Sequence, residues 1–350
     1  MGVIGHIPER EAPRPRSASI WDVARVAGVS QQTVSRVING KDRVSESTRA
    51  KVLQVIDELD FRPNRLAQAL AGGPIRSVTV LTSDTALYGA AATLRGMEQA
   101  ARAAGFSVGI SVLERSLDAA EAAVRLNRSG QAVMVIAFDE AGVRTLGALP
   151  PEIPMTATIE RPPDDHADAA WQVWLDDRAA AAHATRYLLS LGHSTVHYVA
   201  IPSSTSPTAQ RTLGWRETLT DAGRPVPEPL QGGWSPRSGY LAARSLLADP
   251  TVTAILCGND DLALGVMRAA REAGRRIPGD LSVVGFDDSP QSAYLNPSLT
   301  TVRLDFEGLG RACFGLLRRR LDPDGPAAVP VWSEPELIVR ESSGPRPPAR

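Results

Sequence analysis

The sequence is poor in the residues that disulfide, redox and metal chemistry require. Only two of the 350 residues are cysteine, and Cys257 and Cys313 lie far apart, with no histidine or other cysteine nearby at metal-ligand spacing. This pattern predicts two reduced, buried thiols and no bound metal. The five histidines show no partner pattern. His193 follows a glycine suited to ending a helix, so we expect a structural role for it, and His183 falls inside a predicted helix.

Long apolar runs are also absent. No stretch approaches the roughly 18 apolar residues that a membrane-spanning helix needs. The first 18 residues, "MGVIGHIPEREAPRPRSA", carry charges and prolines but lack the apolar core of a secretory signal. We therefore expect a cytoplasmic protein without a membrane partner. Their composition predicts disordered tails at residues 1–18 and 343–350.

The motifs of common enzymes are missing. No Gly-x-Gly-x-x-Gly or Walker loop follows a predicted strand, and no serine elbow or metal-binding spacing occurs. These absences disfavour an enzyme, and we expect no cofactor.

Net charge is low overall but unevenly distributed. Residues 1–74 contain 11 Lys and Arg against 8 Asp and Glu, a net charge of +3, whereas residues 75–350 contain 27 against 31, a net charge of −4. A small basic segment on a mildly acidic body hints at a charged polymer as partner. Because the excess is small, such binding would depend on geometry as well as on charge.

Residues 19–60 carry the signals of three short helices. Ser19 and Asp22 have the spacing of a capping box, and Gly28 suits the end of the first helix. Ser30 and Ser45 are placed to cap the second and third helices. The apolar positions recur at helical spacing in each segment: Ile20, Val23, Ala24 and Ala27, then Val34, Val37 and Ile38, then Val52, Val55, Ile56 and Leu59.

The second of these helices, in "GVSQQTVSRVING", has an unusual polar face. Gln31, Gln32, Ser35 and Arg36 stand where a solvated helix normally carries many charges. With a tight Gly-Val-Ser turn before it, the pair of helices predicts a helix-turn-helix unit at residues 19–63. The segment at residues 64–74, "NRLAQALAGGP", contains seven helix-forming residues, which are too few to be stable alone. We interpret it as a linker that forms a helix only when it contacts a partner.

From Ser77 onward, strands alternate with helices. Apolar runs such as "SVTVLT", "AVMVIAF", "VTAILCG" and "LSVVGF" are separated by helical patterns, several of which end in glycine: Gly105, Gly192, Gly223 and Gly274. This alternation predicts parallel sheets with helices on both faces. Residues 75–342 exceed what one sheet usually takes, so an α/β body of two lobes with a cleft is expected.

Four segments together resemble the lac/gal repressor family of bacterial transcription regulators. They are "SIWDVARVAGVSQQTVSRVING", "RVSESTRAKVLQVIDELDFRPNRLAQALAGG", "GNDDLALGVMRAAREAGRRIPGDLSVVGFDD" and "PSLTTVRLDF". The resemblance covers residues 19 to about 340. It implies a helix-turn-helix domain, a hinge helix and a two-lobed core like that of periplasmic binding proteins. It also implies a homodimer that binds a palindromic operator in double-stranded DNA under the control of a small molecule, usually a sugar.

Within that resemblance, the polar helix becomes a recognition helix in the major groove. Glutamine can pair with adenine and arginine with guanine, so Gln31, Gln32 and Arg36 are the candidates for reading bases. The alternative is a solvated face that touches nothing. The remaining polar residues are candidates for phosphate contacts: Ser30, Thr33, Ser35, Asn39, Ser45 and Thr48.

In the family, paired hinge helices lie in the minor groove and insert a leucine between base pairs, which bends the duplex. Leu70 occupies that position in this sequence, and Asn64 and Ala67 lie on the same face. Without the resemblance, a lone leucine on so short a helix would more often be a packing residue.

A sugar presents apolar ring faces and directional hydroxyls, so its pocket needs an aromatic plane and polar groups on rigid strand ends. Trp234 matches the family's aromatic platform, Phe306 a cleft wall, and Arg211, Asn259 and Asp287 the hydroxyl-binding positions. The loop "TSDTALYGAAATL" aligns with the one that supplies apolar contacts in lactose-type repressors, through Ser83, Leu87, Gly89, Ala90 and Thr93.

Other interpretations remain open for several residues. Asp287 could be a cap, Asp288 is expected to be structural, and Trp171 and Trp215 are expected to pack. Three positions depart from the lactose-type pattern: Leu304, Pro207 and Ala137 stand where such repressors have an amide, a serine and an asparagine.

The resemblance favours a repressor released by a galactoside or related glycoside. Activation, or a ligand acting as corepressor, remains possible on sequence. No leucine heptads follow "ELIVR", so a dimer is expected. A sugar-binding protein of the transport type, without DNA function, is the rival interpretation. It would lack residues 19–73.

Overall fold

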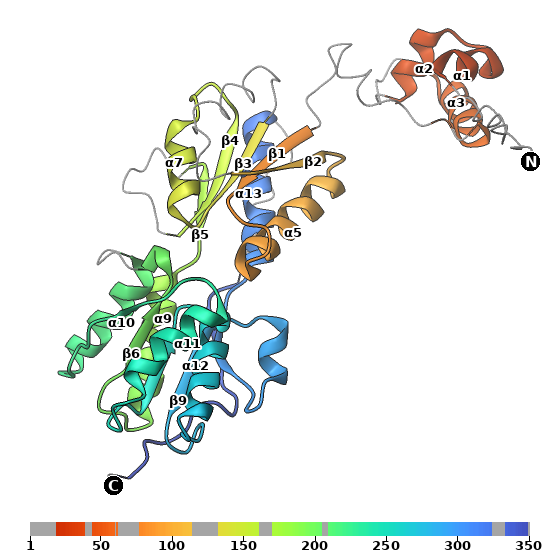
Figure 1. Cartoon of the computed structure of the whole chain (residues 1–350). Helices are drawn as coiled ribbons and strands as arrows, with labels where there is room; N and C mark the ends of the chain where they lie inside the picture. Colours follow the sequence, from red (N-terminus) through yellow and green to blue (C-terminus); the bar gives the residue numbers. More distant parts are fainter. Residues whose placement is uncertain are drawn as a thin grey trace, which may run out of the picture. The chain divides into compact units, whose positions relative to one another are not determined.

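The computed structural model describes residues 19–38, 44–59, 61, 77–113, 132–160, 170–204, 209–323 and 333–348. The chain divides into two compact units, Met1–Pro74 and Ile75–Arg350 (Figure 1). Asn39, Asn64, Ala67, Leu70 and Pro207 lie outside the described residues, as do the expected tail at 1–18 and residues 64–74.

The first unit contains the three helices that the sequence predicts, with the expected caps. The capping box between Ser19 and Asp22 is present, Gly28 ends the first helix with a left-handed φ of 65°, and the Ser45 hydroxyl accepts from the amide of Thr48. The helices are α1 (Ile20–Ala27), α2 (Gln31–Ile38) and α3 (Glu46–Glu58). Among the described residues of this unit, eight buried side chains form the core: Val23, Ala24, Ala27, Val34, Val37, Val52, Val55 and Phe61.

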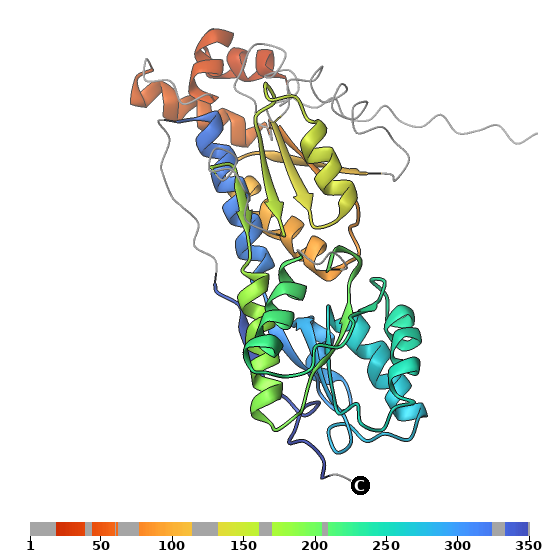
Figure 2. The ribbon, with the colours of Figure 1, turned by 90° about the vertical axis from the view of Figure 1, so that its left-hand side faces the viewer.

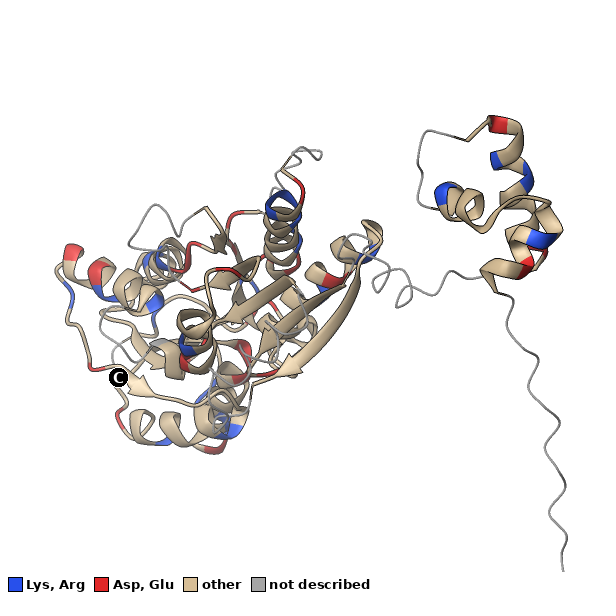
Figure 3. Ribbon diagram, turned by 90° about the horizontal axis from the view of Figure 1, so that it is seen from above, with Lys and Arg blue, Asp and Glu red and all other residues tan. Residues whose placement is uncertain are grey.

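The charges of the first unit are mixed. Basic residues are distributed over its helices with acidic residues between them (Figure 3). None of the three described helices therefore carries a large excess of positive charge.

The second unit holds two separate sheets, which confirms the predicted α/β body. The strands of the first sheet are all parallel, and α5 (Tyr88–Ala103) and α13 (Phe306–Leu321) cover one face, with α7 (Glu140–Ala148) on the other (Figures 1 and 2). The strand order is β2 (Ser107–Val112), β1 (Ser77–Thr82), β3 (Ala132–Ala137), β4 (Met155–Ile159) and β5 (Gln172–Trp174).

The second sheet is parallel except for its last strand, β11, at one edge. Helices α9 (Asp177–Ser190) and α10 (Gln210–Asp221) share a core with one face, and α11 (Pro236–Leu246) and α12 (Asp260–Glu272) with the other. The order is β11 (Glu336–Ile338), β10 (Thr300–Arg303), β9 (Ser282–Asp287), β8 (Ala254–Cys257), β6 (His197–Ala200) and β7 (Leu230–Gln231).

Helix ends in this unit follow the glycine signals. Gly105, Gly192, Gly223 and Gly274 all have left-handed φ values between 61° and 90°, as their positions after helices predict. Both cysteines are buried free thiols. Trp215 is fully buried and donates its indole N–H to the carbonyl of Val196 at 2.9 Å, so the packing role expected for it is confirmed.

The end of the chain differs from the disordered tail expected at residues 343–350. Gly344 donates its amide to the Ser282 hydroxyl at 3.0 Å, and Arg346 donates its amide to the carbonyl of Leu191 at 2.9 Å. His193 is buried beside this segment, with Nδ1 2.9 Å from the Thr253 hydroxyl and Nε2 3.2 Å from the carbonyl of Gly344. Composition missed this order because the segment is held by polar groups of distant elements and not by its own apolar side chains. Among the described residues, no helix is long and apolar enough to cross a membrane.

Candidate DNA-contacting helix and ligand pocket

Helix α2 buries one face and leaves the polar residues outward. Val34 and Val37 are buried, Gln32 and Arg36 are exposed, and Gln31 is half-buried. The hydrophobic side therefore fixes the helix, while amide and guanidinium groups project from it. These are the groups able to form paired hydrogen bonds with base edges.

The polar residues around α2 divide into capping and non-capping groups. The Ser30 hydroxyl accepts from the amide of Thr33 at 3.2 Å and lies 2.9 Å from its hydroxyl. Ser45 caps α3 through the amide of Thr48 at 3.3 Å. Ser30 with Thr33, and Ser45 with Thr48, thus stabilise the first turns of α2 and α3. All four are proposed phosphate contacts, and the free backbone N–H groups at a helix N-terminus also favour an anion.

Sequence reasoning missed Trp21. Its side chain is 69% exposed, an unusual position for a tryptophan in so small a domain. It lines a shallow hollow together with Ser30, Gln31 and Gln32. The signal was present in the sequence, because Trp21 falls outside the apolar stripe of α1 and so has no place in the core.

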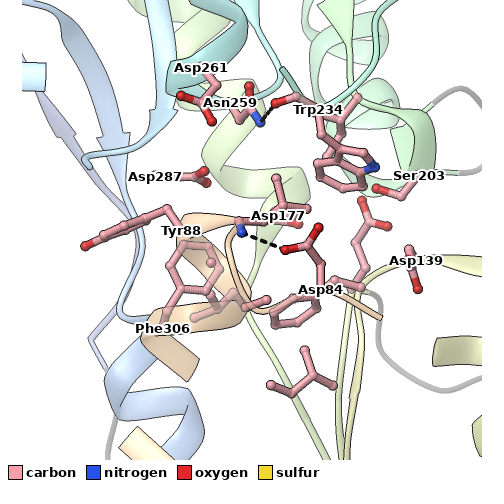
Figure 4. A pocket seen from close by; sticks show the side chains of 18 of the residues that line it. Asp84, Tyr88, Asp139, Asp177, Ser203, Trp234, Asn259, Asp261, Asp287 and Phe306 are labelled. Carbon is pink, nitrogen blue, oxygen red and sulfur yellow. Dashed lines mark hydrogen bonds between the residues drawn. The ribbon is translucent and has the colours of Figure 1, made fainter. Parts of the chain in front are cut away.

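The second unit contains a pocket at the carboxyl ends of the strands of both sheets (Figure 4), where open parallel sheets bind ligands. The first sheet and its helices contribute mainly apolar wall, including Leu87, Phe138 and Ile159. The second sheet and its helices contribute most of the polar groups. They include Asp177, Ser203, Arg211, Asn259, Asp261 and Asp287.

Nine of the ten predicted ligand-binding residues line this pocket: Ser83, Leu87, Gly89, Ala90, Arg211, Trp234, Asn259, Asp287 and Phe306. Thr93 does not. It is fully buried on α5 and donates its hydroxyl to the carbonyl of Gly89 at 2.8 Å, which places it behind the loop. Gly89 itself faces the Phe306 ring so closely that a Cβ there would lie 2.9 Å from the ring.

Arg211 forms the centre of the polar floor. Its Nε lies 3.2 Å from a carboxylate oxygen of Asp177, and both side chains are less than a tenth exposed. Its Nη1 donates to the carbonyl of Gly258, and its guanidinium stacks 4.4 Å from the Phe286 ring centre. Burial lowers the pKa of Arg211, but the carboxylates of Asp177, Asp287 and Glu160 outweigh this effect and raise it overall.

Glu160, which the sequence reasoning missed, stands at the end of β4 and lines the same floor. Burial, and then the charge of Asp177, raise the pKa of Glu160 to about 7. Among the described residues, one of its carboxylate oxygens, one oxygen of Asp177 and the hydroxyl of Ser203 are buried without a hydrogen bond of ordinary geometry, although the Ser203 hydroxyl is near enough to Glu160 to lower its pKa. These atoms are available to hydroxyl donors of a ligand, since buried polar groups usually find partners.

Asn259 and Asp260 also shape the pocket from within the protein. The side-chain oxygen Oδ1 of Asn259 accepts from the backbone amide of Leu262 at 2.8 Å and so caps α12. The side-chain nitrogen Nδ2 donates to the backbone carbonyl of Trp234 at 3.3 Å, so Asn259 also fixes the loop that carries this tryptophan. Asp260 accepts from the hydroxyls of Ser292 at 2.6 Å and Thr301 at 2.6 Å. Burial raises the pKa of Asp260 to about 6.

Of the three residues where the chain departs from the lactose-type pattern, Leu304 and Ala137 are buried, and Pro207 lies outside the described residues. Leu304 and Ala137 belong to the hydrophobic cores. The pocket thus joins apolar walls and an indole with a few convergent hydrogen-bonding groups, the combination that suits a sugar ring. Among the described residues, no group of three or more His, Cys, Asp or Glu is arranged to hold a metal ion.

Comparisons with known proteins show which family and which domains the chain resembles. Residues 19–64 match the family described as bacterial regulatory proteins, lacI family, and residues 185–343 match a periplasmic binding protein-like domain. The chain is 36% identical to the lactose operon repressor of Escherichia coli (strain K12) over 310 residues, 85% of this chain and 82% of that protein. It is 32% identical to catabolite control protein A of Priestia megaterium, over 93% of this chain and 99% of that one.

Solved structures give the same result. The lac repressor dimer bound to operator and the anti-inducer ONPF matches with a TM-score of 0.77 at 30% identity, over 94% of this chain and all of that one. The complex of the transcriptional regulator CelR with cellobiose matches with a TM-score of 0.68 at 29% identity, over 93% and 99% of the two chains. The predicted combination of a helix-turn-helix with a core like that of periplasmic binding proteins is therefore confirmed.

Proposed function

Because the chain belongs to the lacI family of bacterial regulatory proteins, we propose that it is a sugar-responsive transcriptional repressor. In this proposal a homodimer binds a palindromic operator through residues 19–63 and the hinge at 64–74. A galactoside or related glycoside in the pocket of residues 75–342 then releases the DNA. The observation that carries the proposal is the presence, on one chain, of an outward polar recognition helix and a pocket with unpartnered polar atoms.

The DNA part rests on α2 and on the N-termini of α2 and α3. Gln31, Gln32 and Arg36 would read base edges. Ser30, Thr33, Ser35, Asn39, Ser45 and Thr48 would fix the register on phosphates. A similar solved structure supports this assignment, since it holds the lac repressor dimer bound to operator.

The ligand part rests on the pocket. Trp234 would stack on an apolar sugar face, while Arg211 and Asp287 would bond its hydroxyls. Glu160, Asp177 and Ser203 extend this set, because each has a buried oxygen without a partner. Ser83, Leu87, Gly89, Ala90 and Phe306 would form the apolar wall, with Asn259 holding the tryptophan loop.

Control follows from linkage between the two sites. If sugar changes operator affinity by a given factor, operator must change sugar affinity by the same factor, typically about 5- to 150-fold. The test is titration with lactose, ONPG and cellobiose, with and without operator DNA. Weaker sugar binding in the presence of DNA supports release, and stronger binding supports a corepressor. Identical dissociation constants would show that the pocket does not control the DNA.

Asp287→Ala sharpens the same experiment. The variant should lose the sugar response while its operator affinity without sugar is unchanged, because Asp287 lines the pocket and α2 belongs to the other unit. A sugar-binding protein of the transport type would bind these glycosides and fail to bind the operator at all.

A further inference from the structure

Two consecutive residues at the edge of the pocket adopt a backbone conformation that side chains other than glycine rarely take. Asp287 has a φ of 107° and Asp288 a φ of 51°. They follow β9, and Asp287 lines the pocket (Figure 4). Such a conformation persists only where surrounding contacts hold it. The contacts that hold this turn therefore determine the direction in which the Asp287 carboxylate points in the pocket.

Asp288 is fixed through both of its carboxylate oxygens. One accepts from Nη2 of Arg340 at 2.6 Å, and the other accepts from Nε of Arg303 at 2.8 Å. The Asp288 side chain is only 9% exposed, so this pairing is largely shielded from water. Its backbone amide donates to the Thr301 hydroxyl at 3.3 Å.

The next residue is held by a different element. The amide of Ser289 donates to Asp260 at 2.8 Å, and its hydroxyl donates to the same oxygen at 3.1 Å. Asp260 is itself anchored on α12. Hydrogen bonds to Asp260 of α12 and to the two arginines therefore hold the turn at Asp288 and Ser289. Asp287 comes immediately before these two residues.

The two arginines are not equivalent. Arg303 is 51% exposed and shares its guanidinium with Glu336, whereas Arg340 is 17% exposed. Arg340 also donates Nη1 to the carbonyl of Leu299 at 2.7 Å and its amide to the Thr300 hydroxyl at 2.9 Å. A shielded, multiply bonded guanidinium holds its partner more firmly than an exposed one, since exposed pairs are weakened by solvent.

We propose that Arg340 is a positioning residue for the ligand pocket: through Asp288 it holds the strained turn that aims the Asp287 carboxylate. Arg340 does not itself line the pocket. The inference rests on the proposed function in one respect, namely that Asp287 contacts the sugar. The mechanical part, that Arg340 fixes the turn, stands without it.

Hydrogen exchange of the sugar-free full chain tests the mechanical part. In Arg340→Met, the amides of Asp288 and Ser289 should exchange at least ~10-fold faster, because their protection depends on this turn staying closed. Arg303→Met should change them less than ~3-fold, as expected for an exposed pair. Unchanged exchange at both amides in Arg340→Met overturns the proposal, whether or not any sugar binds.

Sugar affinity tests the functional part, using whichever of lactose, ONPG and cellobiose stabilises the wild-type protein most. Arg340→Met should weaken binding by ~10-fold or more, with partial rescue by Arg340→Lys. Asp288→Asn should weaken it similarly, and the double variant should be no worse than either single change, because residues acting through one contact are not additive. Additive losses would show that Arg340 acts by another route.

Arg275→Met controls for a merely structural loss. Arg275 also bonds carbonyls of the second sheet's lobe, donating to Val252 at 2.6 Å and to Asp280 at 3.0 Å, but it does not line the pocket. This variant should lower the unfolding temperature without changing sugar affinity. If it weakens sugar binding as much as Arg340→Met, the effect is general destabilisation and the proposal fails. If no sugar binds the wild-type protein, the proposed function fails, and the exchange measurement still decides the role of Arg340.

Discussion

The recognition helix and the ligand pocket are both polar, but they are organised over different distances. In the first unit, the polar groups are positioned by partners three residues away, as with Ser30 and Thr33 or Ser45 and Thr48. In the pocket, Arg211 bonds a carbonyl 47 residues away and Asp288 an arginine 52 residues away. One surface is built locally, and the other is assembled from strand ends that are distant in sequence.

This difference predicts different responses to substitution. Exposed side chains on α2 do not depend on one another for their positions, so changes there should act separately and on single bases. Pocket side chains share buried contacts, so removing one should disturb the others and the stability of the unit. The following predictions test this contrast, from the largest expected effect to the smallest.

Asp177→Ala should have the largest effect. It leaves the buried guanidinium of Arg211 without its ion pair, which typically costs roughly 3–5 kcal/mol. Calorimetry of the full chain should show a large fall in the unfolding temperature of the second unit. Sugar binding should be lost as well, since Arg211 lines the pocket.

The matched control is Arg178→Ala, the neighbouring residue. Arg178 forms an ion pair with Glu217 at 2.7 Å, but its side chain is 53% exposed, so its loss should cost about 0–1 kcal/mol. Equal destabilisation by the two variants would remove the distinction between shielded and exposed pairs on which the contrast depends.

Changes at Gln31 and Gln32 should have intermediate effects, confined to DNA. Loss of one paired contact to a base should cost about 1–3 kcal/mol at one operator position, with little effect at the others. Selection from randomised operators with Gln31→Ala, Gln32→Ala and Arg36→Ala measures this. The stability of neither unit should change much, because these side chains form no part of the core. An unchanged consensus for all three variants would contradict the assignment of α2.

Glu160→Gln should have the smallest effect at acidic pH, and the effect should be visible as a change in pH dependence. With its pKa raised from 4.5 to about 7, folded Glu160 keeps a proton that the unfolded chain has already released in this window. Wild-type stability should therefore fall as pH rises from about 4.5 to 7, whereas glutamine has no proton to lose. Because one pKa unit corresponds to about 1.4 kcal/mol, the variant should gain at most about 3 kcal/mol over the wild type across that window and no more above it. Denaturant unfolding at several pH values, without sugar, measures the difference. A constant gap would show that Glu160 does not titrate there.

Much of the first unit follows from sequence because its determinants are local. The capping box at Ser19, the left-handed Gly28 and the apolar stripes all lie within one or two helical turns. The sequence also predicts the alternation of strands and helices in the second unit, because buried parallel strands appear as continuous apolar runs. Short strands such as β5, β7 and β11 have only two or three residues and carry no periodic signal.

The sequence by itself determined the longer elements, many of their caps, the order of the domains and the resemblance through which nine of the ten predicted ligand-binding residues were found in the pocket. Only the tertiary structure decided that Asp177 pairs with Arg211 close to Glu160, that the side chain of Asn259 caps α12, and that Arg340 bonds Asp288. The physical reason is that helical periodicity and capping depend on neighbours along the chain. Which carboxylates share a pocket floor, and how far burial shifts their pKa values, depends on strand order and on the shielding that the packed lobes create.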